Sequence, residues 1–253
     1  MRGSSKRRPA AERSARLLQQ QIELGGQELF LNRLTREEVF THTEATKSGT
    51  ADTLALDSIE KVKSLPVLPA SYEELRSAAL SCDRCRLSES RTQAVFSDGA
   101  VDARLVVVGE APGANEDRTG IPFVGAAGRY LDLLLATVGM SRKDSVYICN
   151  VLKCRPPDNR NPMPDEISAC SSFLKKQLEL VNPQALLAVG SFAAQLLTGQ
   201  EKTTLGGLRA EVHSYRDIPL VCTYHPAALL RNPKWTRSFW EDLQLLRAVL
   251  DSA

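Results

Sequence analysis

Four of the six cysteines have a spacing that suits one metal site. Cys82 and Cys85 form a C-x-x-C pair, in which both thiolates can reach the same ion or cluster. Cys154 follows 69 residues after Cys85, and Cys170 lies 16 residues further on. Because no histidine lies close to them in the sequence, four thiolates suit either a Cys₄ zinc site or a [4Fe–4S] cluster. The spacing does not choose between these two, and the C-x-x-C pair taken alone could also be a redox-active dithiol.

The segment that follows Val108 has the composition of a ligand-binding loop. It reads Gly-Glu-Ala-Pro-Gly over residues 109–113, and glycine permits a close approach of backbone to ligand. It lacks the Gly-Lys-Ser/Thr ending of a phosphate-cradling loop, which argues against a nucleotide triphosphatase. Glu110 could be a general base, or it could be an exposed turn carboxylate. Phe123 lies among prolines and glycines, where an aromatic side chain has little reason to join the core, so it could be a stacking platform.

A second loop begins at Asn150, at the end of an apolar run. A carboxamide offers both a donor and an acceptor, as reading the polar edge of a base or an amide requires. A turn cap is the alternative role for this asparagine. Arg155 and Arg160 in the same loop could contact phosphates or could simply be solvated.

A third loop contains His225, one of three histidines in the chain. It could belong to a site formed with the two other loops, or it could be a structural histidine with satisfied hydrogen bonds. Leu229 and Leu230 are followed by Arg231 and resemble an exposed apolar wedge more than a core segment. Proteins that deform DNA insert such wedges between base steps.

The elements that must position these loops alternate along the chain. Short apolar runs predict buried parallel strands at 104–109, 146–150, 185–190 and 219–223. Apolar residues at helical spacing predict helices at 72–80, 125–138, 164–181, 191–198 and 237–250. The alternation predicts an α/β fold with a parallel sheet covered on both faces, and ligands of such sheets bind beyond the carboxyl ends of the strands. Cys149 and Cys222 lie inside two of these strands and are expected to be small buried core residues.

Composition excludes several classes of protein. The chain has 253 residues, of which 43% are hydrophobic and 25% charged, and the formal net charge is only +2. These values exclude collagen-like, wholly disordered and disulfide-stapled chains. No apolar run approaches the roughly 20 residues of a membrane-spanning helix. The basic N-terminus has no apolar signal-peptide core, so we expect a cytoplasmic protein.

The charge and composition change along the chain and suggest three parts. Residues 1–40 form a basic, partly helical extension, whose first 16 residues contain six basic side chains and one acidic. Residues 41–70 are rich in Thr, Ser, Ala and Pro and are expected to be a flexible linker. Residues 71–253 form the folded domain and hold 21 basic and 21 acidic residues. The extension could be a solvated tail, or it could add phosphate contacts or recruit a partner.

Together, these motifs resemble those of the family-four uracil-DNA glycosylases, the iron–sulfur members of the uracil-DNA glycosylase superfamily. The resemblance covers roughly residues 71–250 and leaves residues 1–70 outside it. It rests on several motifs in the expected order: Gly-Glu-Ala-Pro-Gly at 109–113 with Glu-Asp at 116–117, Pro-Phe-Val-Gly at 122–125, Asn-x-x-Lys-Cys-Arg-Pro-Pro at 150–157 and His-Pro-x-x-Leu-Leu-Arg at 225–231.

The resemblance implies a three-layer α/β/α sandwich with a central four-stranded parallel sheet. It also implies a DNA-repair enzyme that flips uracil out of DNA and hydrolyses its N-glycosidic bond, leaving an abasic site. Cys82, Cys85, Cys154 and Cys170 would hold a [4Fe–4S] cluster. The implied partner is uracil-containing DNA, single- or double-stranded, and no membrane. We further expect a monomer that is associated with the nucleoid of a bacterial or archaeal cell. A repair or replication protein could bind the N-terminal extension.

The resemblance also assigns roles to the residues of the three loops. Phe123 would stack on uracil, while Asn150 would bond its polar edge. His225 would donate to O2, and Glu110 would orient or deprotonate the attacking water. Ala111 would line the pocket. Leu230 and Arg231 would belong to a loop that enters the minor groove of DNA.

Two other functions stay open at this point. One is a protein that captures uracil-DNA without turnover, as a sister group in the superfamily does. That group has Gln at the position of Ala111 and a His-containing insertion near the second loop, and neither is present here. The other is an iron–sulfur or zinc-stabilised interaction protein, which would explain the cysteines but not Phe123, Asn150 and His225.

Overall fold

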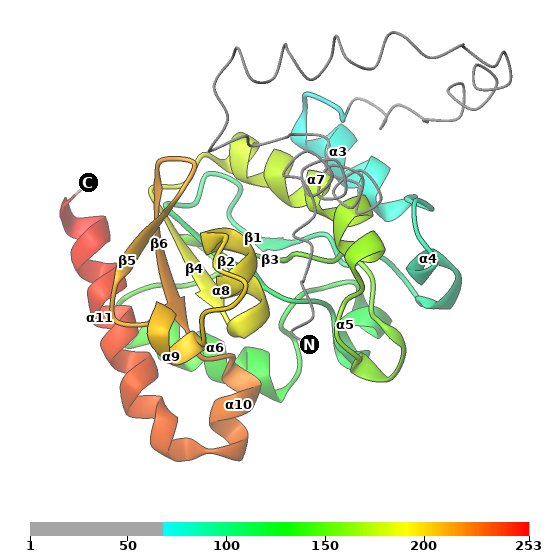
Figure 1. Ribbon diagram of the computed structural model, residues 1–253. Helices are drawn as coiled ribbons and strands as arrows, with labels where there is room; N and C mark the ends of the chain where they lie inside the picture. Colours follow the sequence, from blue (N-terminus) through cyan, green and yellow to red (C-terminus); the bar gives the residue numbers. More distant parts are fainter. Residues whose placement is uncertain (1–67, 253) are drawn as a thin grey trace, which may run out of the picture. The chain divides into compact units, whose positions relative to one another are not determined.

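The computed structural model describes residues 68–252, which include the expected folded domain except for its last residue (Figure 1). The expected N-terminal extension, residues 1–40, lies outside the described residues, as does the expected linker apart from residues 68–70. No helix in the described part of the chain is both long enough and apolar enough to cross a membrane.

One mixed sheet of six strands forms the centre of the domain. The strands lie in the order β1-β3-β2-β4-β6-β5. The four central strands are parallel, as predicted: β2 (Leu105–Gly109), β3 (Val146–Asn150), β4 (Ala185–Val189) and β6 (Ile218–Thr223).

Two antiparallel edge strands extend this predicted four-stranded sheet. They are β1 (Asp98–Gly99) and β5 (Val212–Tyr215). The sequence did not reveal them because β1 has only two residues and β5 has no buried residue, so neither has an apolar run. Edge strands of this kind do not need the hydrophobic runs that identify a buried parallel strand.

Helices cover both faces of the sheet, so the predicted three-layer α/β/α sandwich is confirmed (Figure 1). The helices that carry most of this packing begin and end within two residues of their predicted bounds. They are α3 (Tyr72–Leu80), α6 (Ala126–Ala136), α7 (Pro164–Val181), α8 (Ser191–Thr198) and α11 (Thr236–Ser252). Short helices complete the domain: α4 (Leu87–Ser90), α5 (Ala114–Thr119), η2 (Pro157–Asn159), α9 (Leu205–Leu208), α10 (Pro226–Arg231) and η3 (Pro233–Trp235).

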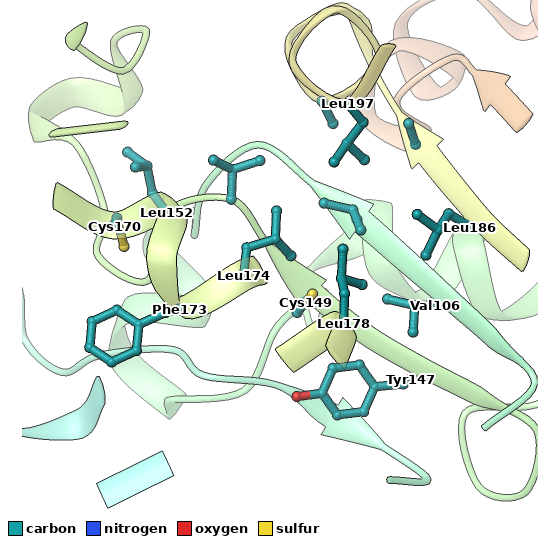
Figure 2. Packing of buried hydrophobic residues seen from close by; sticks show 14 of the residues in the cluster. Val106, Tyr147, Cys149, Leu152, Cys170, Phe173, Leu174, Leu178, Leu186 and Leu197 are labelled. Carbon is teal, nitrogen blue, oxygen red and sulfur yellow. The ribbon is translucent and has the colours of Figure 1, made fainter. Parts of the chain in front are cut away.

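Alternate residues of each strand enter two separate cores, because successive side chains of a strand point to opposite faces. Val106 and Val108 pack against α3, α7 and α8, whereas Leu105 and Val107 pack against α6 and α11. Figure 2 shows the first of these cores, in which side chains of α7 meet those of β2, β3 and β4. Cys149 and Cys222 are fully buried in it, as predicted, and so act as small core residues.

The start of α7 ties together two segments that carry cysteines. Pro164 occupies the first turn, and the carboxylate of Glu166 accepts a hydrogen bond from the Met163 N–H at 2.9 Å. The same fully buried carboxylate pairs with Arg160 at 2.6 Å and with Arg86, next to Cys85, at 3.6 Å. A buried carboxylate needs such partners. Glu166 therefore connects the C-x-x-C segment with the loop that follows β3.

Candidate active site

A cavity of about 480 Å³ lies beyond the carboxyl ends of β2, β3 and β6, where the sequence placed a ligand. All three loops singled out in the sequence contribute to its wall. The predicted site residues that line it are Glu110, Ala111, Phe123, Asn150, His225 and Arg231. The structure therefore brings together side chains that are up to 121 positions apart in the sequence.

Gly109 makes room for two of these side chains. It ends β2 and lies in register with Asn150, the last residue of β3. A Cβ atom at Gly109 would lie 2.3 Å from Asn150 Oδ1 and 2.7 Å from Phe123 Cζ, far closer than van der Waals contact. Any residue larger than glycine would therefore displace the carboxamide and the aromatic ring from the cavity.

Asn150 is buried, with 2% of the residue exposed, yet its carboxamide makes no hydrogen bond to another described residue. A turn cap would bond to nearby backbone, so the structure argues against that alternative. Buried amides are normally paired. The side chain that lines the cavity thus has both a donor and an acceptor available for a ligand.

Phe123 belongs both to the cavity and to the core. The residue is 6% exposed and packs in the core cluster on the α6 and α11 face, so the expectation that it would avoid the core is wrong. Its ring also lines the cavity and lies 5.6 Å from the His225 ring, tilted by 30°. The apolar packing behind the ring fixes a flat aromatic surface at the cavity wall.

Glu116 is a cavity residue to which sequence reasoning gave no role, although it belongs to a quoted motif. Its Oε1 accepts hydrogen bonds from the N–H groups of Val124 and Gly125, both at 3.0 Å. The carboxylate therefore holds the backbone directly after Phe123. The sequence offered a clue in the acidic pair that follows Pro-Gly, but not the partner that this pair contacts.

Glu110 also lies at the cavity wall, directly after β2. Burial raises the pKa of its carboxyl group. Its backbone carbonyl accepts a hydrogen bond from the Leu152 N–H at 3.0 Å, which ties the first loop to the second. The half-buried position favours a role inside the cavity over that of an exposed turn carboxylate.

His225 has a defined proton position. Its Nδ1 accepts a hydrogen bond from the Ala227 N–H at 3.2 Å, so a proton on the neutral ring must be at Nε2. Burial, and to a lesser extent the positive charge of Arg231, lower the pKa of the imidazole to about 4. At neutral pH the ring is therefore an uncharged donor through Nε2–H.

The residues around His225 hold its loop in place. Thr223 donates a hydrogen bond to Asp242 at 2.6 Å, and Asp242 also pairs with Arg209 at 2.7 Å. The Arg209 guanidinium lies 4.3 Å over the Tyr224 ring, which stacks on Trp235 with ring centroids 4.7 Å apart. Thr223 and Tyr224, which directly precede His225, are thus anchored by α11 and by η3.

The expected apolar wedge is narrower than the sequence indicated. Residues 226–231 form the helix α10, which places successive side chains in different directions. Leu229 is 1% exposed and packs in the core, so its assignment to an exposed wedge is wrong. Leu230 is 49% exposed and Arg231 is also exposed, which leaves these two at the surface. Arg231 lines the cavity and Leu230 does not.

The four spaced cysteines surround a second, small cavity. Cys154 and Cys170 are buried, while Cys82 and Cys85 are half-buried. Burial raises the pKa of the Cys170 thiol to about 11 and also raises that of Cys154. Within residues 68–252, no three His, Cys, Asp or Glu side chains converge closely enough to hold a single metal ion. The thiols therefore line a space without meeting at one point.

Two cationic residues flank this cysteine cavity. Arg91 donates a hydrogen bond to Cys154 Sγ at 3.1 Å, and the backbone N–H of Lys153 donates to Cys170 Sγ at 3.2 Å. The Lys153 side chain is almost fully buried, and its Nζ donates to the backbone carbonyl of Asn150 at 2.6 Å. Burial lowers the pKa of this ammonium group. No carboxylate within the described residues pairs with Lys153, so no acidic partner in this part of the chain offsets the cost of burying its positive charge.

The chain is similar in sequence to uracil-DNA glycosylases. A family model described as "Uracil DNA glycosylase superfamily" matches residues 96–244. A type-4 uracil-DNA glycosylase of Archaeoglobus fulgidus is 40% identical over 181 residues, which cover 69% of this chain and 90% of that protein. One from Thermotoga maritima is 44% identical over 152 residues, covering 60% of this chain and 79% of that protein. A type-5 uracil-DNA glycosylase of Pyrobaculum aerophilum is 36% identical over 146 residues, which cover 52% and 64% of the two chains.

The protonation state of His225 can be measured directly. We expect its imidazole to titrate at about pH 4 and to carry its proton on Nε2 above that pH, because burial disfavours the cation and Nδ1 is an acceptor. Nitrogen-15 NMR of the histidine rings across a pH series reports both properties. Titration at the ordinary value for histidine, or a proton on Nδ1 at neutral pH, would contradict this assignment.

Proposed function

The chain belongs to the uracil DNA glycosylase superfamily, and we propose that it is a DNA-repair enzyme that excises uracil from DNA by hydrolysing the N-glycosidic bond. The observation that carries this proposal is the meeting of an aromatic ring, an unpaired carboxamide and a neutral imidazole donor in one cavity. A stacked nucleotide cannot expose its glycosidic bond, so the base must first be flipped into this cavity, at a cost of a few kcal/mol.

Recognition of the base would rest on Phe123 and Asn150. The Phe123 ring offers a stacking surface that is fixed by the core behind it. The Asn150 carboxamide can accept from uracil N3–H and donate to O4, whereas cytosine presents the opposite donor and acceptor pattern. A mismatched base would leave buried polar groups unsatisfied, which costs about 1–3 kcal/mol for each group.

His225 would stabilise the leaving uracil. Cleavage of the glycosidic bond leaves a uracil anion and an oxocarbenium-like sugar. A Nε2–H donor placed at O2 strengthens its hydrogen bond as negative charge develops, so it favours the transition state over bound substrate. Because Nδ1 is held by the Ala227 N–H, the ring needs no proton transfer to present that donor.

Glu110 would act on the nucleophile. Its carboxyl group lies at the cavity wall, and burial raises its pKa, which makes the carboxylate a stronger proton acceptor. We propose that it orients the attacking water and takes its proton. Arg231 and the exposed Leu230 lie beside the site on α10 and would contact DNA around the flipped nucleotide.

We propose that the cysteine cavity holds a [4Fe–4S] cluster, with Cys82, Cys85, Cys154 and Cys170 as its ligands. Four thiols that surround a space suit a cluster better than one ion, and an anionic group there would favour the charged form of the buried Lys153 side chain. When bound, the cluster would supply structure and no redox step, since hydrolysis moves no electrons. It would tie the segment before β1 to the loop after β3.

Release of free uracil distinguishes the proposed enzyme from a protein that captures uracil-DNA without turnover. Ala111 and the absence of histidine from residues 155–164 favour turnover. The expectations of a monomer, a cytoplasmic location and a protein partner for residues 1–40 stay predictions.

The mechanism predicts that His225→Ala lowers the single-turnover rate of uracil release roughly 10²- to 10³-fold, the usual effect of losing one such donor. The measurement is release of uracil from a labelled oligonucleotide that contains one uracil. His213→Ala is the matched control, because His213 bonds the Leu208 carbonyl at 2.7 Å and is not among the residues lining the cavity. An equal rate for the His225 variant and the wild type would contradict the assigned role.

Metal loss should impair both stability and recognition. We expect Cys154→Ala to lose iron and acid-labile sulfide, to melt at a lower temperature and to release uracil more slowly, because Cys154 is four residues from Asn150. Cys222→Ala is the control, since that thiol is buried in the core away from the cavity. Purified wild-type protein that holds zinc in place of iron would reject the cluster, and full activity and stability of the Cys154 variant would reject its structural role.

A further inference from the structure

The backbone of Phe123 adopts a conformation that side chains other than glycine rarely take. Its φ angle is 53°, in the left-handed region. A bulky residue in that region is strained and persists only where the surroundings hold it. The turn that presents the aromatic ring therefore needs contacts that stabilise its backbone.

Arg142 supplies such contacts from outside the cavity. This residue lies between α6 and β3, 19 positions after Phe123, and belongs to none of the motifs. Its Nη1 donates to the carbonyl of Pro122 at 3.2 Å, and its Nη2 donates to the carbonyl of Phe123 at 3.0 Å. One guanidinium thus bonds the two successive carbonyls that bracket the strained residue.

The guanidinium is itself fixed by two acids from different elements. Asp98 of β1 and Asp132 of α6 each contact it at 2.8 Å. Only 18% of the Arg142 side chain is exposed. The planar group has donors on several edges, so it can serve two carboxylates and two carbonyls at once, which an ammonium group cannot do in the same geometry.

The opposite side of the turn leaves no space for it to relax. A Cβ atom at Gly128 would lie 1.7 Å from the Phe123 carbonyl oxygen, so the first turn of α6 packs directly against this backbone. Movement of the turn toward α6 is therefore blocked. Arg142 therefore donates a hydrogen bond to the same carbonyl group whose movement is restricted by α6.

We propose that Arg142 is a positioning residue for uracil recognition, which acts through the backbone of Phe123 to hold the ring in its stacking orientation. This inference rests on the proposed function. Arg142 is not among the residues that line the cavity, so it would affect substrate only through this turn. Stacking is present in both the bound substrate and the transition state, so its loss should appear mainly in KM.

A double-mutant cycle tests the proposal with single-uracil oligonucleotides. We expect Arg142→Gln and Phe123→Ala each to lower kcat/KM roughly 10- to 100-fold, mainly through KM. The double variant should be no worse than Phe123→Ala alone, because Arg142 acts through that ring. Arg142→Lys keeps the charge and one donor and should lose less than Arg142→Gln, and it carries the test if the glutamine variant does not fold.

Arg247→Gln is the matched control. Its guanidinium also bonds a backbone carbonyl, that of Val138 at 3.2 Å, and a carboxylate, that of Asp251, and it is not a cavity residue. We expect this variant to keep the wild-type KM. A merely structural role for Arg142 would lower the active fraction and kcat at constant KM.

Three results would overturn the proposal: losses that multiply in the double variant, an equal KM effect in Arg247→Gln, or an unchanged kcat/KM in folded Arg142→Gln. Each of these can be seen only if the wild type releases uracil. Absence of release by the wild type would instead reject the proposed function, so the two failures are distinguishable.

Discussion

Gly109 and Asn150 end two neighbouring parallel strands in direct register, and the site depends on the contact between them. The missing side chain at Gly109 leaves the space that the Asn150 carboxamide and the Phe123 ring occupy. Parallel strands fix the relative height of their ends through evenly spaced hydrogen bonds, so this space is set by the sheet and not by a flexible loop. The Asn150 carboxamide is therefore positioned by the sheet itself.

Lys153 connects this recognition edge to the cysteine cavity. Its ammonium group bonds the carbonyl of Asn150, while its backbone N–H bonds the sulfur of Cys170. A buried ammonium without a carboxylate is costly, and an anionic cluster beside it would offset that cost. The proposed cluster site and the base-recognition site thus share one segment of five residues, 150–154. A change in the charge of one should therefore alter the geometry of the other.

The sequence was sufficient to predict those parts of the fold that follow from hydrophobic periodicity. The four central strands and the long helices are apolar runs with clear ends, and the rule that ligands bind at the carboxyl ends of parallel strands placed the cavity. The edge strands β1 and β5 were missed because neither buries an apolar run. Leu229 was assigned to the surface because the pattern Leu-Leu-Arg did not reveal that α10 begins at Pro226 and turns this leucine into the core.

Other features of the site depend on contacts between residues far apart in the chain. Neither the left-handed backbone at Phe123 nor the bonds that Arg142 makes to it can be read from local sequence.

Selection of the polar edge of uracil, followed by release of the free base, is the property on which the proposed function depends. It can be measured as single-turnover release of uracil and of cytosine from otherwise identical oligonucleotides. We expect release of free uracil in preference to cytosine by roughly 10⁴-fold or more. Comparable release of both bases, or retention of uracil-DNA without release, would contradict it.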